Sequence, residues 1–230
     1  MEEKEEKMLK VVVFDGGYGG ELFADKLKEE LPVVEVIRVI DWRNAEKLLL
    51  SPKDARRIAE ESLRPYINNV DLIVFSNHLL SLTSLDYFKR KYRKQKFIGL
   101  DLRMPDSFVK HNILILTTKA VARTRKYQNF IFHLKRKHKT LILDSWPDKI
   151  DDGELSETEI NETLKNYLFK VKFEPKEIIL ACAQFSDIKN EIKNVLGKSI
   201  KIYDSFDITI RAIYKELKIR GRTGYKTSQK

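Results

Sequence analysis

Three polar residues with chemical potential stand directly after short apolar runs. Asp15 follows KVVVF, Ser76 follows DLIVF, and Cys182, the only cysteine, follows EIILA. A thiolate is a strong nucleophile, and a serine hydroxyl becomes reactive only beside a base such as histidine. His78 stands two residues after Ser76. The sequence therefore offers a thiol, a hydroxyl and a carboxylate, each at the end of a predicted strand.

A glycine-rich loop follows the first of these runs. Residues 14–20 read FDGGYGG, and a segment with helical spacing comes next. The dinucleotide-binding pattern fails because Leu22 occupies the place of its third glycine, and the phosphate-loop pattern fails because Glu21 follows Gly20. The glycines permit positive φ angles and a close approach of the backbone to a ligand. We interpret this as a ligand loop of another type, with a tight, ligand-free turn as the alternative.

The elements that must position these residues alternate along the chain. Unbroken apolar runs predict strands that are covered on both faces, and segments with helical spacing lie between them. Residues 144–153 are expected to form an acidic loop, and residues 221–230 a polar, disordered tail. Strands are predicted at residues 11–14, 33–40, 71–75, 96–100, 112–116, 140–143, 177–181 and 199–203. Helices are predicted at 21–31, 52–66, 81–94, from 119 to about 137, 156–169, 185–196, and from 206 to about 219.

This alternation predicts an α/β fold with parallel sheets. Polar residues recur at the carboxyl ends of the strands in both halves of the chain, including Thr117 and Asp204. We therefore expect two pseudo-symmetric lobes, each a parallel sheet flanked by helices, with a cleft between them. Residues 1–100 together with 200–230 would form lobe 1, and residues 101–199 would form lobe 2.

Five segments, in order along the chain, resemble the motifs of a known enzyme family. The chain is similar to the cofactor-independent aspartate/glutamate racemase superfamily, and most of all to glutamate racemase. The matching segments are residues 14–20 (FDGGYGG), 76–81 (SNHLLS), 117–121 (TTKAV), 181–186 (ACAQFS) and 203–206 (YDSF).

The resemblance implies a site for a small acidic molecule, an amino acid or a dicarboxylate, between the lobes. In the family one cysteine removes the Cα proton and a second returns a proton on the opposite face, without a cofactor or a metal. The resemblance also suggests a homodimer. Carried over by position, Cys182 and Ser76 would be catalytic. The substrate would contact Asp15, Gly16, Asn77, His78, Thr117, Thr118, Ala183 and Gln184.

Ser76 departs from the family pattern, since it stands where the first cysteine belongs. A free thiol has a pKa of ~8.5, whereas a hydroxyl is nearer the ~15.7 of water. The difference corresponds to roughly 10 kcal/mol, and active sites shift a pKa by only about two to five units. Ser76 could act as a base only with His78 as its partner. The alternative interpretation of His78 is a solvated loop histidine without a role in chemistry. The family's P-Y-G substrate loop is also missing near residues 48–50.

Cys182 leaves three classes of function open. The first is a racemase-like isomerase that acts on an acidic amino acid, with a second base that the sequence does not identify. The second is a one-cysteine lyase or decarboxylase, in which the amino end of the following helix stabilises the Cys182 thiolate. The third is a non-catalytic binding or regulatory protein, in which Cys182 is an inert core residue.

Composition limits the remaining possibilities. The 230 residues carry a net charge of +10, and one cysteine excludes an internal disulfide. The N-terminus is charged and has no apolar signal segment, so we expect a cytoplasmic protein without a membrane span. Two basic runs, at residues 89–96 and 133–139, are typical of solvated helix ends. With a pI of about 9.4, weak and salt-sensitive binding to polyanions is also expected.

Overall fold

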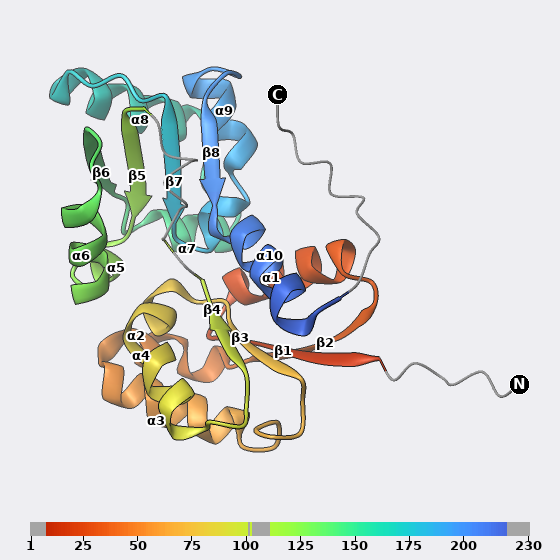
Figure 1. Cartoon of the computed structure of the whole chain (residues 1–230). Helices are drawn as coiled ribbons and strands as arrows, with labels where there is room; N and C mark the ends of the chain where they lie inside the picture. The colour runs from red at the N-terminus through yellow and green to blue at the C-terminus, as the bar shows by residue number, and fades with distance from the viewer. Residues whose placement is uncertain (1–7, 101, 103–110, 220–230) are drawn as a thin grey trace, which may run out of the picture.

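The protein folds into two parallel sheets whose carboxyl edges meet. The computed structural model describes residues 8–100, 102 and 111–219. In these residues one sheet has the order β2 (Val34–Ile40), β1 (Leu9–Asp15), β3 (Leu72–Phe75), β4 (Phe97–Gly99), and the other has the order β6 (His138–Ile142), β5 (Ile113–Thr117), β7 (Glu177–Ala181), β8 (Lys201–Asp204). In Figure 1 the arrowheads of β5, β7 and β8 point toward the half that contains β1–β4. The predicted α/β class with two parallel sheets is confirmed.

The unbroken apolar runs are buried on both faces of each sheet. Val11 and Val13 of β1 pack into one core cluster, and Val12 and Phe14 pack into another on the opposite face. The central strand β5 of the second sheet is divided between two clusters in the same way. Since alternate side chains of a strand point to opposite faces, helices must cover both sides of each sheet.

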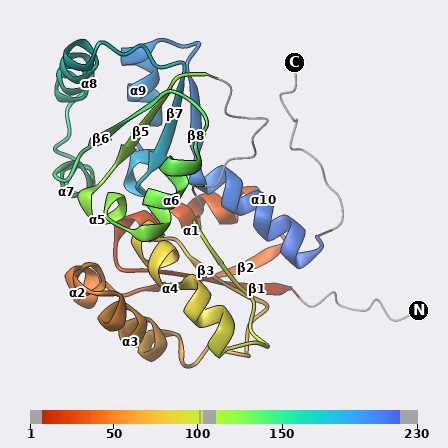
Figure 2. The ribbon, with the colours of Figure 1, turned by 60° about the vertical axis from the view of Figure 1, so that its left-hand side comes forward.

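Helices supply that cover, as Figures 1 and 2 show. Four of them directly follow the strands that end at Asp15, Phe75, Thr117 and Asp204, and their first residues therefore lie near the meeting point of the two sheets. The helices are α1 (Tyr18–Glu30), α2 (Ala45–Leu50), α3 (Pro52–Leu63), α4 (His78–Lys91), α5 (Lys119–Ala122), α6 (Arg125–His133), α7 (Trp146–Asp151), α8 (Glu157–Val171), α9 (Lys189–Leu196) and α10 (Ser205–Leu217).

Several predicted elements need correction. The expected acidic loop at 144–153 contains α7, because Pro147 starts the helix and Trp146 is buried against Phe185. The single helix expected up to residue 137 is two helices, because the Thr124 side chain caps α6 by accepting the Tyr127 amide. Residues 185–196 are likewise divided into a 3-10 turn (Gln184–Ser186) and α9. The helix α2 is not predicted from the sequence at all.

The last helix, α10, packs on the first sheet although it follows a strand of the second. Its residues Phe206, Ile210 and Ile213 share a core cluster with β1 and α1, and the Phe206 ring meets Phe23 edge to face at 5.0 Å. Two predictions fall outside the described residues. They are the change of lobe at residue 101 and the polar tail at residues 221–230. Within the described residues, no helix is long and apolar enough to cross a membrane.

Candidate functional site

The carboxylate of Asp15 ends β1 and lies buried at the meeting point of the two sheets. Its Oδ1 accepts the Gly16 amide at 2.6 Å and the Asn77 side-chain amide at 3.3 Å. Its Oδ2 is buried without a hydrogen-bond partner among the described residues. Burial raises the pKa of Asp15 to about 6, and the hydrogen bonds from Gly16 and Asn77 lower it only in part. The Asp15 carboxyl group therefore titrates near neutral pH, because burial disfavours its ionised form.

Ser76 is fully buried and its hydroxyl is engaged with the backbone. Its Oγ donates to the Phe14 carbonyl at 3.2 Å, which ties the end of β3 to β1. The next residue, Asn77, caps α4 by accepting the Leu80 amide at 3.0 Å. His78 is the first residue of α4 and only 3% exposed, so the interpretation as a solvated loop histidine is wrong. The helix begins three residues earlier than predicted because Asn77 is its cap.

Cys182 lies just beyond β7 and belongs to an apolar core cluster of the second sheet. Its thiol is 8% exposed and donates to Gln184 Oε1 at 3.2 Å. Burial raises the pKa of the thiol to about 12, and the nearby carboxylates of Asp15 and Asp151 raise it further. The amides of Gln184 and Phe185 lower the pKa of the thiol, but they do not offset the effect of burial. Cys182 is a neutral thiol at physiological pH.

The two threonines of the second sheet have structural hydrogen bonds. Thr117 is fully buried and its hydroxyl donates to the Ala181 carbonyl at 3.3 Å. Thr118 caps α5, where its hydroxyl accepts the Val121 amide at 3.5 Å. Of the predicted site residues, Asp15, Ser76 and Asn77 are therefore joined at one strand edge, and Cys182 and Gln184 are joined at the facing edge.

The glycine loop packs tightly, and it does not adopt the left-handed backbone that the sequence suggested. Positive φ angles occur at Gly153 and Gly197, outside this loop. A Cβ on Gly19 would lie 2.7 Å from the Ala183 Cβ, and one on Gly20 would lie 2.4 Å from the Asp15 Cβ. A Cβ on Gly16 would lie 2.7 Å from Cδ1 of Leu48. The loop therefore needs glycine to let α1 approach the second lobe and to let α2 cover residue 16.

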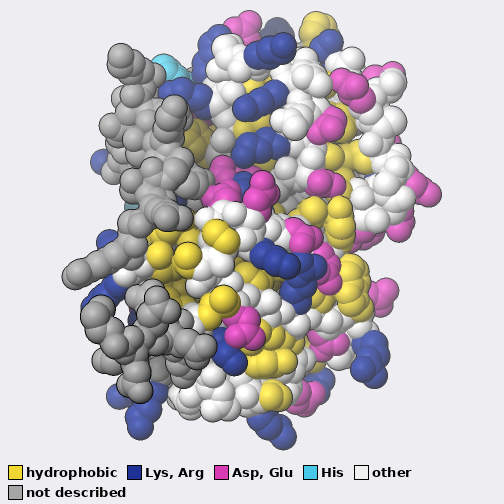
Figure 3. All heavy atoms as spheres, turned by 90° about the vertical axis from the view of Figure 1, so that its right-hand side faces the viewer, with side chains coloured by type: hydrophobic (Ala, Val, Ile, Leu, Met, Phe, Trp, Pro, Cys, Tyr) yellow, Lys and Arg dark blue, Asp and Glu magenta, His cyan; other side chains and the backbone are white. Residues whose placement is uncertain are grey.

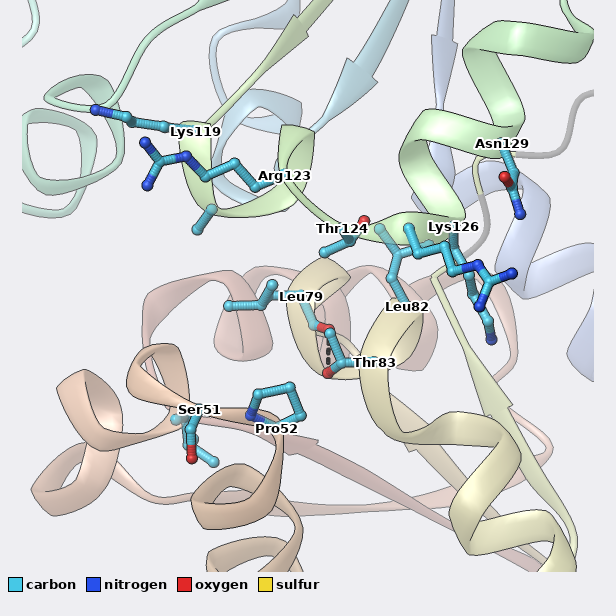
Figure 4. Close-up of a pocket in the computed structure, with 13 residues that line it drawn as sticks. Ser51, Pro52, Leu79, Leu82, Thr83, Lys119, Arg123, Thr124, Lys126 and Asn129 are labelled. Carbon is cyan, nitrogen blue, oxygen red and sulfur yellow. Dashed lines mark hydrogen bonds between the residues drawn. The ribbon is translucent and has the colours of Figure 1, made fainter.

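An open cavity lies beside these packed strand ends, between α3 and α4 on one side and α5 and α6 on the other (Figure 4). Its volume is about 820 Å³. Neither Cys182 nor Ser76 lines this cavity. The first wall carries Leu48, Ser51, Pro52, Leu79, Leu82 and Thr83, and the second carries Lys119, Ala120, Arg123, Thr124, Arg125, Lys126 and Asn129.

The second wall of the cavity is basic. Lys119 and Arg123 are one helical turn apart in the chain, and both side chains extend toward the left of Figure 4. Lys126 pairs with Asp86 at 2.8 Å, whereas Lys119, Arg123 and Arg125 have no ion pair among the described residues. Like charges spaced four residues apart in helical conformation repel by about 0.2–0.5 kcal/mol. The cavity thus has a local excess of positive charge, and an anion would neutralise it.

Proteins of known function resemble this chain over most of its length. No family model matches it. The glutamate racemase of Clostridium perfringens is 22% identical over 214 residues, which cover 89% of this chain and 81% of the relative. The structure of the Francisella tularensis glutamate racemase with D-glutamate superposes with a TM-score of 0.75 at 19% identity, covering 91% of this chain and 81% of the enzyme. The structure of the Escherichia coli glutamate racemase with L-glutamate and the activator UDP-MurNAc-Ala superposes with a TM-score of 0.76 at 19% identity. The superposition covers 93% of this chain and 84% of the enzyme.

The chain is thus similar to glutamate racemases in sequence and has the fold of the aspartate/glutamate racemase structures. Structural likeness at these identities establishes the fold, so the chemistry has to be argued from the side chains. As noted for the family pattern, Ser76 stands where the first cysteine belongs. Leu48 of α2 covers residue 16, in the region where the family's substrate loop is expected.

The superfamily resemblance predicted Asp15, Ser76 and Cys182 as site residues, but it did not predict the basic wall of the cavity. Lys119 and Ala120 of the cavity lie within the family-like segment 117–121. A signal was present in the sequence, because residues 111–143 contain eight Lys or Arg and no Asp or Glu. The arrangement of these residues opposite α3 and α4 is a tertiary feature that no local pattern specifies.

Proposed function

We propose that this chain is a racemase-fold protein that binds a small acidic compound between its lobes and does not perform two-thiol racemisation. The single observation that carries the binding proposal is the pair of Lys119 and Arg123. Both residues line the cavity, and neither side chain forms an ion pair among the described residues, although the Lys119 backbone amide donates to Oδ1 of Asp144 at 2.6 Å. A ligand with one or two carboxylates would accept charge-assisted hydrogen bonds from this pair.

The dimensions and the lining of the cavity agree with such a ligand. Small-molecule sites typically measure ~300–1,000 Å³ and combine apolar walls with a few polar groups. Here Leu79, Leu82 and Pro52 form the apolar side, opposite the cations. Crystal structures of two relatives of the same fold hold D-glutamate and L-glutamate, which supports an acidic amino acid or a related dicarboxylate as the ligand class.

The chemistry of Ser76 and Cys182 argues against racemisation. A two-base mechanism needs groups of similar acidity on the two faces of the substrate, and a thiol differs from a hydroxyl by roughly 10 kcal/mol. Burial is a second obstacle, because it raises the pKa of the Cys182 thiol. The thiol then stays protonated, whereas removal of a substrate proton needs the thiolate. The Ser76 hydroxyl donates to the Phe14 carbonyl and is fully buried.

A one-cysteine lyase, with Cys182 as the acid, is a second candidate. In such a reaction the C–CO₂⁻ bond breaks, CO₂ leaves with the carbon electron pair retained on the substrate, and a neutral thiol protonates that carbon from one face. A thiol with a pKa of about 12 is held in the acid form that this step uses. Release of CO₂ from a malonate-type acid, lost in Cys182→Ala, would support the lyase, and no release would exclude it for that substrate class.

Calorimetric titration with D-glutamate, L-glutamate, aspartate and glutarate tests the binding proposal. The double variant Lys119→Gln/Arg123→Gln should weaken binding at least about tenfold, because a hydrogen bond to a charged group contributes ~1.5–3 kcal/mol. The control Lys170→Gln/Lys215→Gln removes the same charge from exposed positions on α8 and α10 and should bind as the wild type does. Equal weakening in both variants, or no binding by the wild type at millimolar ligand, would contradict the proposal.

A further inference from the structure

A second cavity, here called the α4–α6 cavity, adjoins the basic one. It is lined by α4, α6 and the end of β4, and Figure 2 shows the two helices next to each other at the front of the molecule. Its volume is about 620 Å³. Leu82, Lys126 and Asn129 line both cavities, and the remaining residues that line the second one are its own. The α4–α6 cavity is therefore large enough for a ligand that differs from the one in the basic cavity.

The walls of the α4–α6 cavity are mainly apolar. They are formed by Leu82, Leu85, Leu100, Leu102, Phe130 and Leu134. Ser81 is a buried polar residue of the lining, but its hydroxyl is already engaged. It donates to the Asn77 carbonyl at 2.6 Å and accepts the Leu100 amide at 3.0 Å. The interior thus offers apolar contact rather than hydrogen bonds, which favours a ligand with an apolar body.

Cations outnumber carboxylates at the mouth of this cavity. Asp86, Lys89 and Lys126 are exposed lining residues. Lys126 of α6 pairs with Asp86 of α4 at 2.8 Å. The hydrogen bond from Lys126 lowers the pKa of Asp86, and the nearby charges of Arg90 and Lys89 lower it further. One carboxylate therefore stands beside three cations, and it cannot neutralise all of them.

The excess of positive charge is a local feature of this mouth. On the side of the molecule shown in Figure 3, away from α4 and α6, acidic and basic side chains are interspersed. Lys91, in the same last turn of α4, pairs with Glu60 at 2.5 Å. Lys89 forms no ion pair in the part of the chain that the structure describes. A single anionic group at the mouth would therefore gain a free cation as its partner.

We propose that the α4–α6 cavity binds an amphipathic carboxylic acid. The apolar body of the ligand lies against the leucine-rich walls, and its carboxylate pairs with Lys89 at the mouth. Lys89 takes this role because Asp86 already holds Lys126. The inference goes beyond the small-acid site, since Lys119 and Arg123 belong to the basic cavity and are not among the residues that line this one.

Two fluorescent probes that share one ring system test this proposal. Anilinonaphthalene sulfonate carries one negative charge, and N-phenylnaphthylamine carries none. We expect each probe to bind the wild type at one saturable site, and decanoate to displace both. Lys89→Gln should weaken binding of the sulfonate at least about fivefold and leave the uncharged probe within about twofold, because only the sulfonate loses a charge-assisted hydrogen bond.

Matched variants separate the charge from the walls. Lys94→Gln removes the same charge from an exposed position just beyond α4 and should have no effect on either probe. Leu134→Gln should weaken both probes at least about fivefold, because it makes one apolar wall polar. Leu168→Gln changes an equally half-buried leucine on α8, which packs against the core cluster on the other face of the second sheet, and should leave both probes unaffected.

The test stays valid if Leu134→Gln unfolds, because Lys89 is exposed and its substitution leaves the core intact. Absence of saturable binding by the wild type, failure of decanoate to displace the probes, or equal effects of Lys89→Gln and Lys94→Gln would each overturn the proposal. Lys119→Gln/Arg123→Gln should leave both probes unchanged. Loss of binding in that variant would place the probes in the basic cavity and would also overturn it, whereas the titrations with glutamate and glutarate test the basic cavity separately.

Discussion

At the scale of single residues, burial determines what the candidate site can do. Asp15 and Cys182 face each other across the junction of the two sheets closely enough for the carboxylate to raise the pKa of the thiol. Both groups are buried, and burial favours the neutral form of each. A thiol that stays protonated beside a carboxylate that titrates near pH 6 does not supply the thiolate that two-base catalysis needs.

Asp15 predicts a specific dependence of stability on pH. The pKa of Asp15 is raised from 3.8 to about 6 in the folded chain. The folded state therefore holds the proton more tightly, and the associated stability is full below about pH 4 and lost as pH rises through about 6. The loss amounts to about 3 kcal/mol, at ~1.36 kcal/mol per pKa unit.

Asp15→Asn should remove this dependence, because the amide cannot ionise and its oxygen can still accept the Gly16 amide. Urea unfolding at pH 4 and pH 7 measures the effect. The wild type should lose more free energy of unfolding between the two values than the variant, by about 2.4 kcal/mol, because the unfolded chain is already partly ionised at pH 4. The exposed Asp148→Asn serves as the control, and parallel losses in the wild type and Asp15→Asn would contradict the predicted burial.

Cys182 should be nearly inert in the native state. At pH 8, a pKa of about 12 leaves its thiolate population about a thousandfold below that of a free cysteine. Because Cys182 is the only cysteine, iodoacetamide incorporation followed by mass spectrometry reports on this thiol alone. Labelling should be fast in urea and slower by about three orders of magnitude in the folded protein. Native labelling at the rate of a free thiol would refute a buried, protonated Cys182.

At the scale of elements, the glycine loop joins the two lobes. Its tight contacts hold α1 against the turn after β7, and α2 against residue 16. The sequence predicted the loop and its helix, but it suggested ligand contact where the structure has packing. Sequence patterns cannot make this distinction, because glycine is required both for close approach to a ligand and for close approach to Ala183.

The contact between Gly19 and Ala183 allows a double-mutant test. Gly19→Ala should destabilise the fold by about 1–3 kcal/mol, because its Cβ would meet the Ala183 Cβ at 2.7 Å. Ala183→Gly alone should cost about 0.5–1 kcal/mol. If the two residues touch, the double variant should be more stable than the sum of the single effects by about 1 kcal/mol or more. Additive effects in urea denaturation would show that the lobes do not meet there.

Other elements show where sequence reasoning succeeds and fails. The strands β1, β5 and β7 were predicted closely, because an apolar run buried on both faces carries its own signal. The helices α2 and α7 were missed, since each has only six residues and depends on tertiary contacts of Leu48 and Trp146. The break between α5 and α6 was missed because a capping threonine resembles any other helical residue.

At the scale of the whole molecule, the chain has the fold of the glutamate racemase structures, but the residues where its two sheets meet depart from the family pattern. The strand edges that carry Asp15, Ser76 and Cys182 are packed and hydrogen-bonded, while an open basic cavity lies next to them. The fold class and the residues at the strand ends could be predicted from the sequence. The cavity could not, because its walls come from helices of both lobes that only the folded arrangement brings together.

The exchange of substrate α-protons tests the central claim most directly. Purified protein is incubated with D-glutamate, L-glutamate, D-aspartate or L-aspartate in deuterated water, and the α-proton signal is followed by NMR. We predict that the signal persists and that neither enantiomer converts, even under conditions where calorimetry detects binding. Loss of the α-proton signal with formation of the opposite enantiomer would show that Ser76 and Cys182 act as a working pair of bases, and it would contradict this account.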